Sequence, residues 1–247
     1  SDPENGDILF IRIYKNIRFY IDLSERLIFG ALVLGDIYSE DFLAQFIIFP
    51  ILDFILKRYS YFSIHASGVE VGGKTFIFPA RKESGKSTFS IYLARKGNGF
   101  LGDETVYGKK SGSGIEIFGF PRQIKLYNDS VNFFPELSGL VHDYSCKGLT
   151  RFKIRFPIDR VFKFRFVKKA LPGEIIFLER GEQTRLTRLQ GSEVAGYLIP
   201  ESAGYSDKAT GERYLDFIES LIRVSGAWLL KISSDLDSAY KELEGLI

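Results

Sequence analysis

Apolar and polar positions alternate at the start of the chain, a pattern typical of β-strands with one buried face. Residues 8–23, ILFIRIYKNIRFYIDL, show this alternation and predict a hairpin or meander that opens the fold. From Ser39 to Tyr59 the apolar residues recur at helical spacing, after an N-cap candidate and early acidic residues. We expect a helix there, kinked or split at Pro50.

A second strand pair is predicted around the dipeptide Gly72-Gly73. Residues 62–80, FSIHASGVEVGGKTFIFPA, contain two alternating runs on either side of it. Two glycines suit a tight hairpin because both can take a positive φ. Residues 84–97, SGKSTFSIYLARKG, then show helical spacing and end at a C-cap glycine. The order strand, loop, helix is therefore expected here.

The rest of the chain continues to alternate between strand and helix signals. Strand-like runs are GFLGDETVYG and GIEIFGF around the turn KKSGSG, and later EIIFLER; residues 212–247 predict a helix, a strand near 227–232 and a closing helix capped by Ser234. This alternation predicts an α/β fold with a mixed sheet flanked by helices. We assign residues 1–247 to a single domain. Its parts are 1–62 (strands and a helix), 63–130 (the core that contains the candidate site described below) and 131–247 (a C-terminal part).

Composition narrows the function classes without naming one. The 247 residues suffice for one large domain or two small ones, and we favour one. No apolar run is long enough to span a membrane, and the N-terminal SDPENGDILF does not resemble a secretory signal, so we expect a cytoplasmic protein with no membrane partner. The net charge of +2 does not favour nucleic acid. With only Cys146, His65 and His142 as soft ligands, any metal should be held by oxygen.

The main candidate site is a phosphate-binding loop. Residues 80–87, ARKESGKS, match G-x-x-x-x-G-K-[ST] except that alanine replaces the first glycine. In such a loop, backbone N–H groups surround an anion at a helix N-terminus, Lys86 reaches the β and γ phosphates, and Ser87 holds Mg²⁺. The alternative is a solvated loop whose side chains only cap the helix. The residues we expect to bind nucleotide are Ala80, Glu83, Ser84, Gly85, Lys86, Ser87 and Thr88.

An acidic pair, Asp103-Glu104, follows this loop by one helix and one short strand. In most P-loop hydrolases the metal-binding acids lie further along the chain. If the two strands are neighbours, the pair lies beside the loop, with Glu104 assisting Mg²⁺ and Asp103 accepting a proton from an attacking hydroxyl. The alternative is an exposed acidic pair at the end of a strand.

The block from Ile64 to Gly108 resembles the catalytic core of HPr kinase/phosphorylase, and more closely the short HPr-kinase-related proteins, including the lasso-peptide-associated type. The shared features are a histidine in an I-H-[AG] strand, the P-loop and the early acidic pair. Residues 119–126, GFPRQIKL, resemble a proline-arginine segment of the short proteins. The resemblance is specific over residues 65–126. It implies a PEP-carboxykinase-like P-loop fold and ATP-dependent phosphorylation of a hydroxyl, a serine of a carrier protein or of a precursor peptide.

The resemblance also implies individual roles. Asp103 would be the general base, and His65 would orient Asp103 or touch the transferred phosphoryl group. Arg122 would stabilise charge on that group, because a guanidinium pairs with two oxygens at once. Without the resemblance, His65 is equally a core histidine and Arg122 equally a surface arginine. HPr itself is doubtful as substrate, because the regulatory domain of HPr kinase and the segment after its core have no counterpart here.

These expectations describe a kinase that uses ATP and Mg²⁺ and a hydroxyl-bearing peptide, protein or small molecule as acceptor. The alternatives are an ATPase or GTPase in which Asp103 activates water, and a nucleotide-binding regulatory module with little turnover. Homo-oligomers are possible, since HPr kinase forms hexamers.

One further stretch is unusual. Residues 151–169, RFKIRFPIDRVFKFRFVKK, alternate basic and aromatic side chains at strand period. We favour an amphipathic strand pair with its basic face in water. The alternatives are a docking surface for an acidic partner and, less favoured, a stacking surface for single-stranded nucleic acid.

Overall fold

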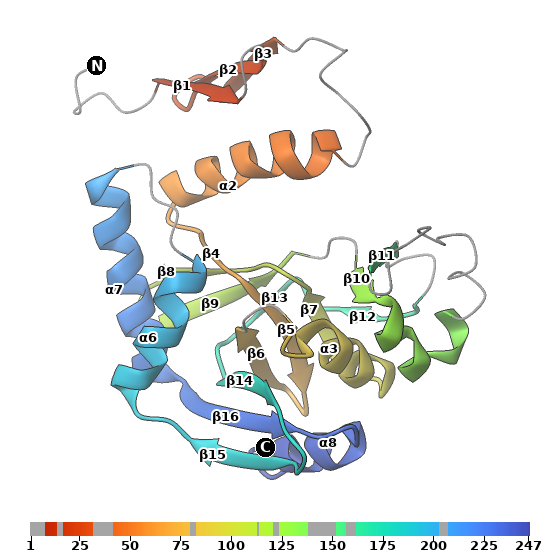
Figure 1. Cartoon of the computed structure of the whole chain (residues 1–247). Coiled ribbons are helices and arrows are strands. Elements are labelled where there is room, and N and C mark those ends of the chain that lie inside the picture. Colours follow the sequence, from red (N-terminus) through yellow and green to blue (C-terminus); the bar gives the residue numbers. More distant parts are fainter. Residues whose placement is uncertain are drawn as a thin grey trace. The chain divides into compact units, whose positions relative to one another are not determined.

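The computed structural model contains two compact units, residues 1–56 and 57–247 (Figure 1). The residues that the structure describes are 8–13, 17–31, 42–79, 83–112, 114–120, 124–137, 152–156, 162–202 and 207–247. Ala80 and Arg122, both predicted to act in the site, lie outside these ranges. The assignment of the whole chain to one domain stays a prediction.

The first unit is a small sheet packed on a helical segment. Strands β1 (Ile8–Ile13), β2 (Ile17–Asp22) and β3 (Leu27–Ala31) form an antiparallel meander, as the alternation predicts. A π-helical segment (Leu43–Ile48) leads into α2 (Phe49–Arg58). The last two residues of α2 belong to the second unit, which begins at Lys57. Pro50 is the second residue of α2, which follows the π-helical segment without an interruption, so the helical run is not split there and the predicted kink stays a prediction. The buried residues of this unit are Ile17, Phe19, Ile21, Ile47 and Ile51.

The second unit is built around a mixed seven-stranded sheet of described strands. In spatial order these are β12 (Arg165–Phe166), β7 (Gly99–Gly102), β5 (Ala66–Val71), β6 (Lys74–Pro79), β14 (Glu174–Arg180), β16 (Gly226–Ile232) and β15 (Arg185–Arg188). Strands β6 and β14 sit in the middle of the sheet, and all but the first residue of β6 are buried, as expected for a strand covered on both faces.

Two smaller sheets complete this unit. One contains β13 (Lys169–Ala170), β9 (Gly114–Gly119), β8 (Val106–Ser111) and β4 (Phe62–Ile64), in that order. The other is an antiparallel ribbon of β10 (Ile124–Tyr127) and β11 (Lys153–Phe156), and after β10 come two short 3₁₀ helices, η3 (Asn128–Phe133) and η4 (Pro135–Leu137).

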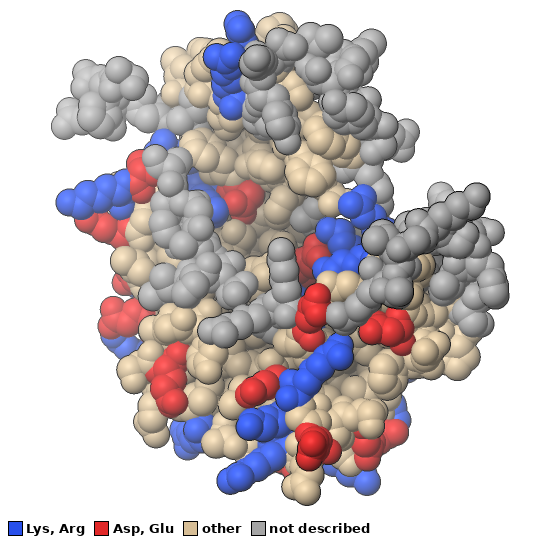
Figure 2. Space-filling model, in the orientation of Figure 1, with Lys and Arg blue, Asp and Glu red and all other residues tan. Residues whose placement is uncertain are grey.

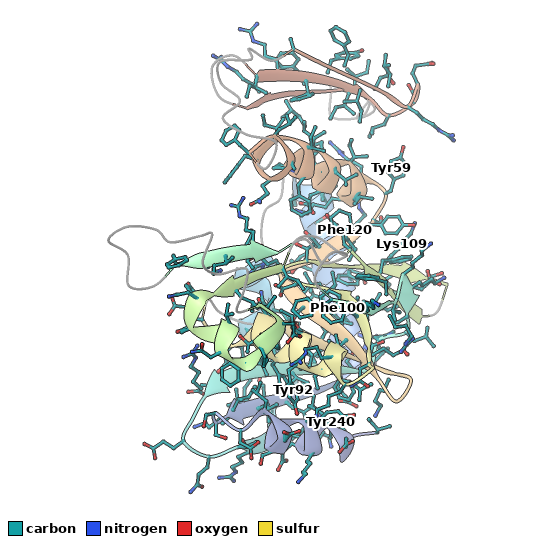
Figure 3. All side chains as sticks on the ribbon, turned by 90° about the vertical axis from the view of Figure 1, so that its right-hand side faces the viewer. Tyr59, Tyr92, Phe100, Lys109, Phe120 and Tyr240 are labelled. Carbon is teal, nitrogen blue, oxygen red and sulfur yellow. The ribbon has the colours of Figure 1, made fainter. Side chains whose placement is uncertain are left out.

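Helices cover both faces of the central sheet (Figure 1). Helices α3 (Lys86–Arg95) and α8 (Leu236–Glu244) share one buried cluster with Phe76 and Phe78 of β6. Helices α6 (Gly191–Ser202) and α7 (Lys208–Val224) share the other with Ile77 of the same strand. In Figure 3, Tyr92 and Tyr240 mark the place where α3 meets α8, and both pack on the first cluster. The alternation along β6 therefore divides the unit into two cores.

The order of the strands brings several strand ends to one edge of the sheet. Strands β6 and β14 are parallel, as are β14 and β16, while β5 runs antiparallel to both β6 and β7. The ends of β6, β7, β14 and β16 and the start of β5 therefore meet at the same edge. Ligands of open α/β sheets bind at this edge, beyond the carboxyl ends of the parallel strands.

Several predicted elements are confirmed. Gly72 and Gly73 have φ of 57° and 81° in the β5–β6 hairpin, and Gly97, with φ of 92°, follows α3. The helix, strand and helix of the C-terminal part correspond to α7, β16 and α8. The predicted cap of the last helix is wrong: Asp235, not Ser234, accepts hydrogen bonds from the N–H groups of Asp237 and Ser238, at 3.0 and 3.1 Å.

The basic and aromatic stretch does not pair with itself in the described residues. Its strand β11 pairs with β10, β12 with β7, and β13 with β9. The predicted strand pair within residues 151–169 is therefore wrong for these segments, because each finds a partner elsewhere in the chain. On the face of the molecule drawn in Figure 2, the basic and acidic side chains of the described residues are interspersed.

None of the helices in the described ranges combines the length and apolar character needed to cross a membrane.

Candidate functional site

The loop between β6 and α3 lies at the edge where the strand ends meet. Of this loop the structure describes Glu83, Ser84 and Gly85, after which α3 begins at Lys86. Gly85 has φ of 94°, and a Cβ there would meet nothing within 4 Å. Glycine is therefore needed for its backbone conformation rather than for space. The N-cap residue of α3 is Gly85, which has no side chain that could cap the helix, and the first N–H groups of a helix point outward at its N-terminus, where an anion can bind.

Two side chains from other strands hold the loop at Glu83. The Tyr127 hydroxyl donates to Glu83 Oε1 at 3.0 Å, and Arg180 Nε donates to the Glu83 carbonyl at 3.1 Å. Glu83 has φ of 71° and Glu104 has φ of 64°, a region that side chains other than glycine seldom adopt. Backbone strain of this kind collects at functional sites, and both residues lie at this one.

Lys86 is 9% exposed and lies against a histidine. Its Nζ is 3.2 Å from Nε2 of His65, which stands just before β5. An ammonium can only donate, so this contact requires His65 Nε2 to accept. His65 thus contacts Lys86, the first residue of α3. Its predicted roles toward Asp103 and the phosphoryl group stay predictions.

Asp103 follows β7 and is fully buried. Neither carboxylate oxygen has a hydrogen bond of acceptable geometry from the described residues. Burial raises the pKa of Asp103 above its usual range, while the charge of Lys86 and the nearby Ser87 hydroxyl lower that pKa in part. The predicted neighbourhood of loop and acid is therefore present, although β5 separates β7 from β6. Asp103 does not itself line the cavity formed by the described residues.

Glu104 is in a different environment from its neighbour. Burial would raise the pKa of Glu104, but the hydrogen bond and charge of Lys125, with the charges of Lys86 and Lys153, bring the net pKa below the usual value. The Lys125 Nζ to Glu104 Oε2 distance is 2.8 Å. Glu104 is thus ionised and paired, so a metal bound by this carboxylate would either share it with Lys125 or displace Lys125.

These groups surround a small cavity of about 60 Å³. It brings together most of the predicted site residues, namely His65, Glu83, Ser84, Gly85, Lys86, Ser87, Thr88 and Glu104. Six further lining residues were not predicted from the sequence: Lys125, Leu126, Tyr127, Ser130, Lys153 and Arg180. One signal was available for Arg180, because it ends the buried strand EIIFLER and the ends of parallel strands carry binding residues. Lys125 and Tyr127 come to the loop on β10, and Lys153 on β11, whose pairing no local pattern reveals.

The residues present fit a Mg²⁺ ion that is shared with a phosphate. Within the described ranges no three acidic, histidine or cysteine side chains gather as a metal cage. Mg²⁺ in nucleotide sites usually takes only one or two protein oxygens, with phosphates and water completing its shell. Ser87 and Glu104 line the same cavity and offer such oxygens.

Comparisons with known proteins add little to the geometry. No protein-family model matches the chain, and no curated protein matches its sequence. Among solved structures, the chain is similar to the HPr(Ser) kinase/phosphatase from Coxiella burnetii, with a TM-score of 0.35 and 13% identity over 73% of this chain and 91% of that one. A likeness this distant assigns neither a family nor an activity, so the function must be inferred from the site.

Proposed function

We propose that the chain binds a nucleoside triphosphate on the loop before α3 and transfers its γ-phosphoryl group to a hydroxyl, as an HPr-kinase-like enzyme with a PEP-carboxykinase-like P-loop fold. The acceptor would be a serine of a peptide or protein, or a small metabolite. One observation carries the proposal: Asp103 is fully buried beside Lys86 and Ser87, and none of the described residues gives its oxygens a hydrogen bond of good geometry. A carboxylate so placed costs stability and therefore points to a function.

The raised pKa of Asp103 suits a general base. A base is most effective when its pKa lies nearer the working pH, and burial moves this carboxyl in that direction. Loop opening or substrate approach must bring the acceptor hydroxyl to Asp103, because the carboxylate is covered in this structure.

The proposed transfer is an in-line displacement at the γ-phosphorus. The acceptor oxygen forms the new P–O bond as the bond to the β-phosphate oxygen breaks, and the nucleoside diphosphate leaves with that electron pair. The hydroxyl proton passes to an Asp103 oxygen. The products are a phosphate ester and a nucleoside diphosphate, and the proton is later released to water.

Cations around the cavity would stabilise the charge that moves in this step. Lys86 lies at the N-terminus of α3, Lys125 and Lys153 approach from the β10–β11 ribbon, and Arg180 from the end of β14. Mg²⁺, when bound at Ser87 and Glu104, would neutralise phosphate charge. We propose that Lys125 then moves from Glu104 to a phosphate oxygen, which keeps both charges paired.

The test is a phosphate-transfer assay read by mass spectrometry. The purified protein, Mg-ATP and cell-extract fractions of metabolites, peptides and proteins are combined, and each fraction is searched for a phosphorylated species. Asp103→Asn should still bind ATP but make no product. The control is Asp216→Asn, because Asp216 forms a surface ion pair with Lys110; this variant should behave as wild type.

The outcomes separate the proposal from its alternatives. A phosphorylated acceptor made only by the proteins with Asp103 supports a kinase. Consumption of ATP with no labelled acceptor favours a hydrolase, and binding without turnover favours a regulatory module. Unchanged transfer by Asp103→Asn would reject Asp103 as the base.

A further inference from the structure

The outer face of the meander in the first unit is exposed, and the proposed transfer makes no use of it. Strand β2 buries alternate residues in the core of this unit, beginning with Ile17, so its exposed residues Arg18 and Tyr20 point to the opposite side. Residues directly opposite each other in antiparallel strands share a face. The register of β1, β2 and β3 therefore identifies the other residues of this outer face (Figure 1).

Three aromatic side chains cross the outer face in one row. Tyr20 lies opposite Phe10 of β1 and opposite Phe29 of β3. The exposed fractions are 67% for Phe10, 37% for Tyr20 and 68% for Phe29. Ile8 and Leu27, 56% and 53% exposed, extend the row at one end of the strands. Opposite side chains lie close enough to form one surface, and a contiguous exposed apolar surface indicates a binding site.

The other end of the outer face is basic. Arg12 and Arg18 are partners across β1 and β2, and both are exposed. Like charges directly opposite each other destabilise a strand pair, so an anionic partner explains this pair better than folding does. Asp22, the acid that the structure describes on this face, already accepts hydrogen bonds from the Ser24 hydroxyl at 2.6 Å and from the N–H groups of Ser24 and Glu25 at 3.0 Å. The face therefore presents positive charge beside its aromatic row.

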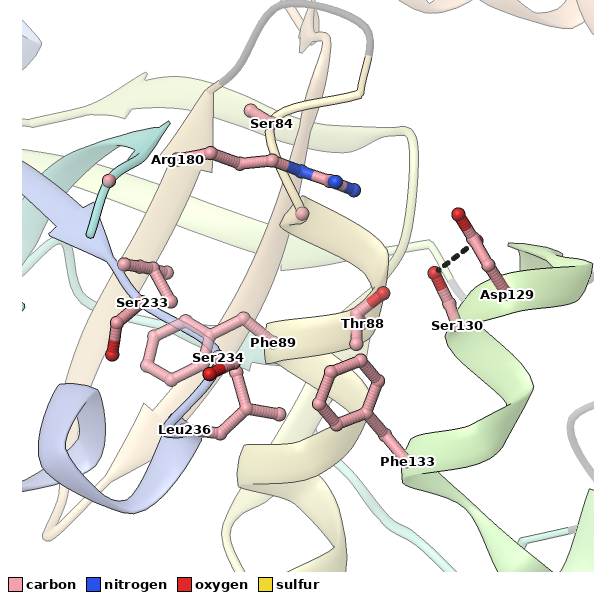
Figure 4. Close-up of a pocket in the computed structure, with 13 residues that line it drawn as sticks. Ser84, Thr88, Phe89, Asp129, Ser130, Phe133, Arg180, Ser233, Ser234 and Leu236 are labelled. Carbon is pink, nitrogen blue, oxygen red and sulfur yellow. Dashed lines mark hydrogen bonds between the residues drawn. The ribbon is translucent and has the colours of Figure 1, made fainter. Parts of the chain in front are cut away.

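This face and the phosphate site belong to different units. The face lies within residues 1–56, whereas the residues that line the phosphate cavity all lie in the second unit, as do those of a neighbouring cavity of about 300 Å³ (Figure 4). A small metabolite bound in the second unit would not need a separate aromatic face. A peptide or protein is long enough to bind one unit while it presents a hydroxyl to the other.

We propose that the outer face of the first unit docks the acceptor of the transfer, a peptide or protein segment that carries acidic side chains next to aromatic or branched aliphatic ones. The apolar side chains of this segment pack on Phe10, Tyr20 and Phe29. Its carboxylates pair with Arg12 and Arg18, because a guanidinium binds both oxygens of a carboxylate. The inference rests on the proposed function and deepens it, since it selects a peptide or protein over a small metabolite as acceptor.

Two other occupants fit the face less well. A second copy of the chain would bring the same two arginines, with Asp22 as the described acid of its face, so cations would outnumber acids in the contact. A single-stranded nucleic acid would stack on the aromatic row, but it also needs cations along its backbone. Ile8 and Leu27, which flank the row, suit apolar side chains of a peptide instead.

The test selects ligands from random peptides displayed on phage, with the full chain as bait. We expect the wild type to enrich peptides that combine Asp or Glu with aromatic or branched aliphatic residues. The Kd of the enriched peptides, made synthetically and measured by fluorescence anisotropy, should rise at least about tenfold in the double variant Phe10→Ala/Phe29→Ala, because two apolar contacts are lost. Phe166→Ala is the matched control, because Phe166 is 41% exposed and lies in β12 of the second unit.

Charge reversal gives a result that unfolding cannot imitate. Arg18→Glu should no longer bind the acidic peptides and should enrich basic ones from the same library. The control is Lys208→Glu, at the start of α7, where the lysine side chain is 90% exposed. This variant should enrich the same peptides as the wild type.

The phosphate-transfer assay links the face to the acceptor. The double variant Phe10→Ala/Phe29→Ala should raise the KM of the acceptor about tenfold. It should leave kcat and the Kd of ATP unchanged, because it alters docking and not the phosphate site. A structural defect that spreads to the second unit would instead change all three quantities.

Each claim can fail separately. If the wild type enriches no acidic and apolar peptides, if the double variant binds them with the same Kd, or if the acceptor has the same KM for both proteins, the docking proposal is wrong and the proposed transfer stands. A dimer that dissociates in the double variant, or a single-stranded oligonucleotide that displaces the peptides, would assign the face to another partner and overturn the proposal. Peptide binding by the face with no phosphorylated acceptor in any fraction would reject the proposed transfer, and the role in recruiting an acceptor would fail with it.

Discussion

Replacing Asp103 by Asn is expected to stabilise the fold, whereas replacing the adjacent Glu104 by Gln is expected to destabilise it. Asp103 is fully buried and receives no hydrogen bond of good geometry from the described residues, while Glu104 is paired with Lys125 at 2.8 Å. Both substitutions keep the size of the side chain and remove its charge. The two residues are adjacent in the chain, so opposite changes in folding stability would reflect the different environments of their carboxylates.

The magnitudes follow from burial and pairing. A buried polar group without a partner costs about 1–3 kcal/mol, and more when charged. Asn keeps the polarity and loses the charge, and Lys86 offsets part of the cost, so we expect a gain of about 1 kcal/mol, or about 2–4 °C in Tm for a chain of this size. A hydrogen bond to a charged group contributes about 1.5–3 kcal/mol. Because the Glu104 side chain is 23% exposed, we expect a loss near the lower limit.

The pH dependence gives a sharper assay than a single Tm. The folded pKa of Asp103 is raised, so its ionisation costs stability as pH rises, and the advantage of Asp103→Asn should grow with pH. The folded pKa of Glu104 is lowered, so its contribution is present above the unfolded pKa and is lost as pH falls through the folded value. The penalty of Glu104→Gln should therefore shrink on acidification.

Calorimetric melts of the three proteins from about pH 3 to about pH 8 measure both trends, and groups that titrate in all three cancel in the differences. Parallel curves for wild type and Asp103→Asn, or a Tm lowered by that substitution at every pH, would refute the account of a costly buried charge. A penalty for Glu104→Gln that grows on acidification would refute the ion pair.

Two further predictions concern the loop. Gly85→Ala places a side chain on a residue with φ of 94°, and backbone strain of this kind costs about 1–3 kcal/mol. We expect a lower Tm and a loss of ATP affinity in titration. Wild-type affinity would show that the left-handed conformation is dispensable. Tyr127→Phe removes one hydrogen bond to Glu83, a contribution of about 1 kcal/mol. We expect a several-fold rise in the Kd of ATP and a Tm lowered by at most about 2–4 °C, and an unchanged Kd would show that this bond does not hold the loop in its binding conformation.

Local features were predictable where local chemistry determines them. The Gly72-Gly73 hairpin follows from the need for two positive φ values, and α3 begins directly after the glycine of the P-loop motif. Asp103 was expected beside the loop because it ends the next strand after α3. The structure brings it there by another route, with β5 between the two strands, because all the relevant strand ends share one edge.

The features that sequence reasoning missed depend on contacts between distant segments. Lys125 and Arg180 reach the site on β10 and β14, and their positions follow from the strand order of the sheets. Helix α6 was not predicted, and its sequence, GSEVAGYLIPES, contains two glycines and a proline that weaken a helical signal. The basic and aromatic stretch was expected to pair with itself, but alternation fixes only which side chains share a face. It does not identify the partner strand.

The most direct test of the central claim is a titration of Mg-ATP into wild type and Lys86→Ala. Lys86 stands at the N-terminus of α3, and Lys96, which follows the other end of the same helix and pairs with Asp237, provides the matched control as Lys96→Ala. We predict that Lys86→Ala loses at least about tenfold in affinity, as expected when a charged contact of about 1.5–3 kcal/mol is removed, whereas Lys96→Ala binds as wild type. Equal affinity of all three proteins for ATP would contradict the claim that this loop binds the phosphates.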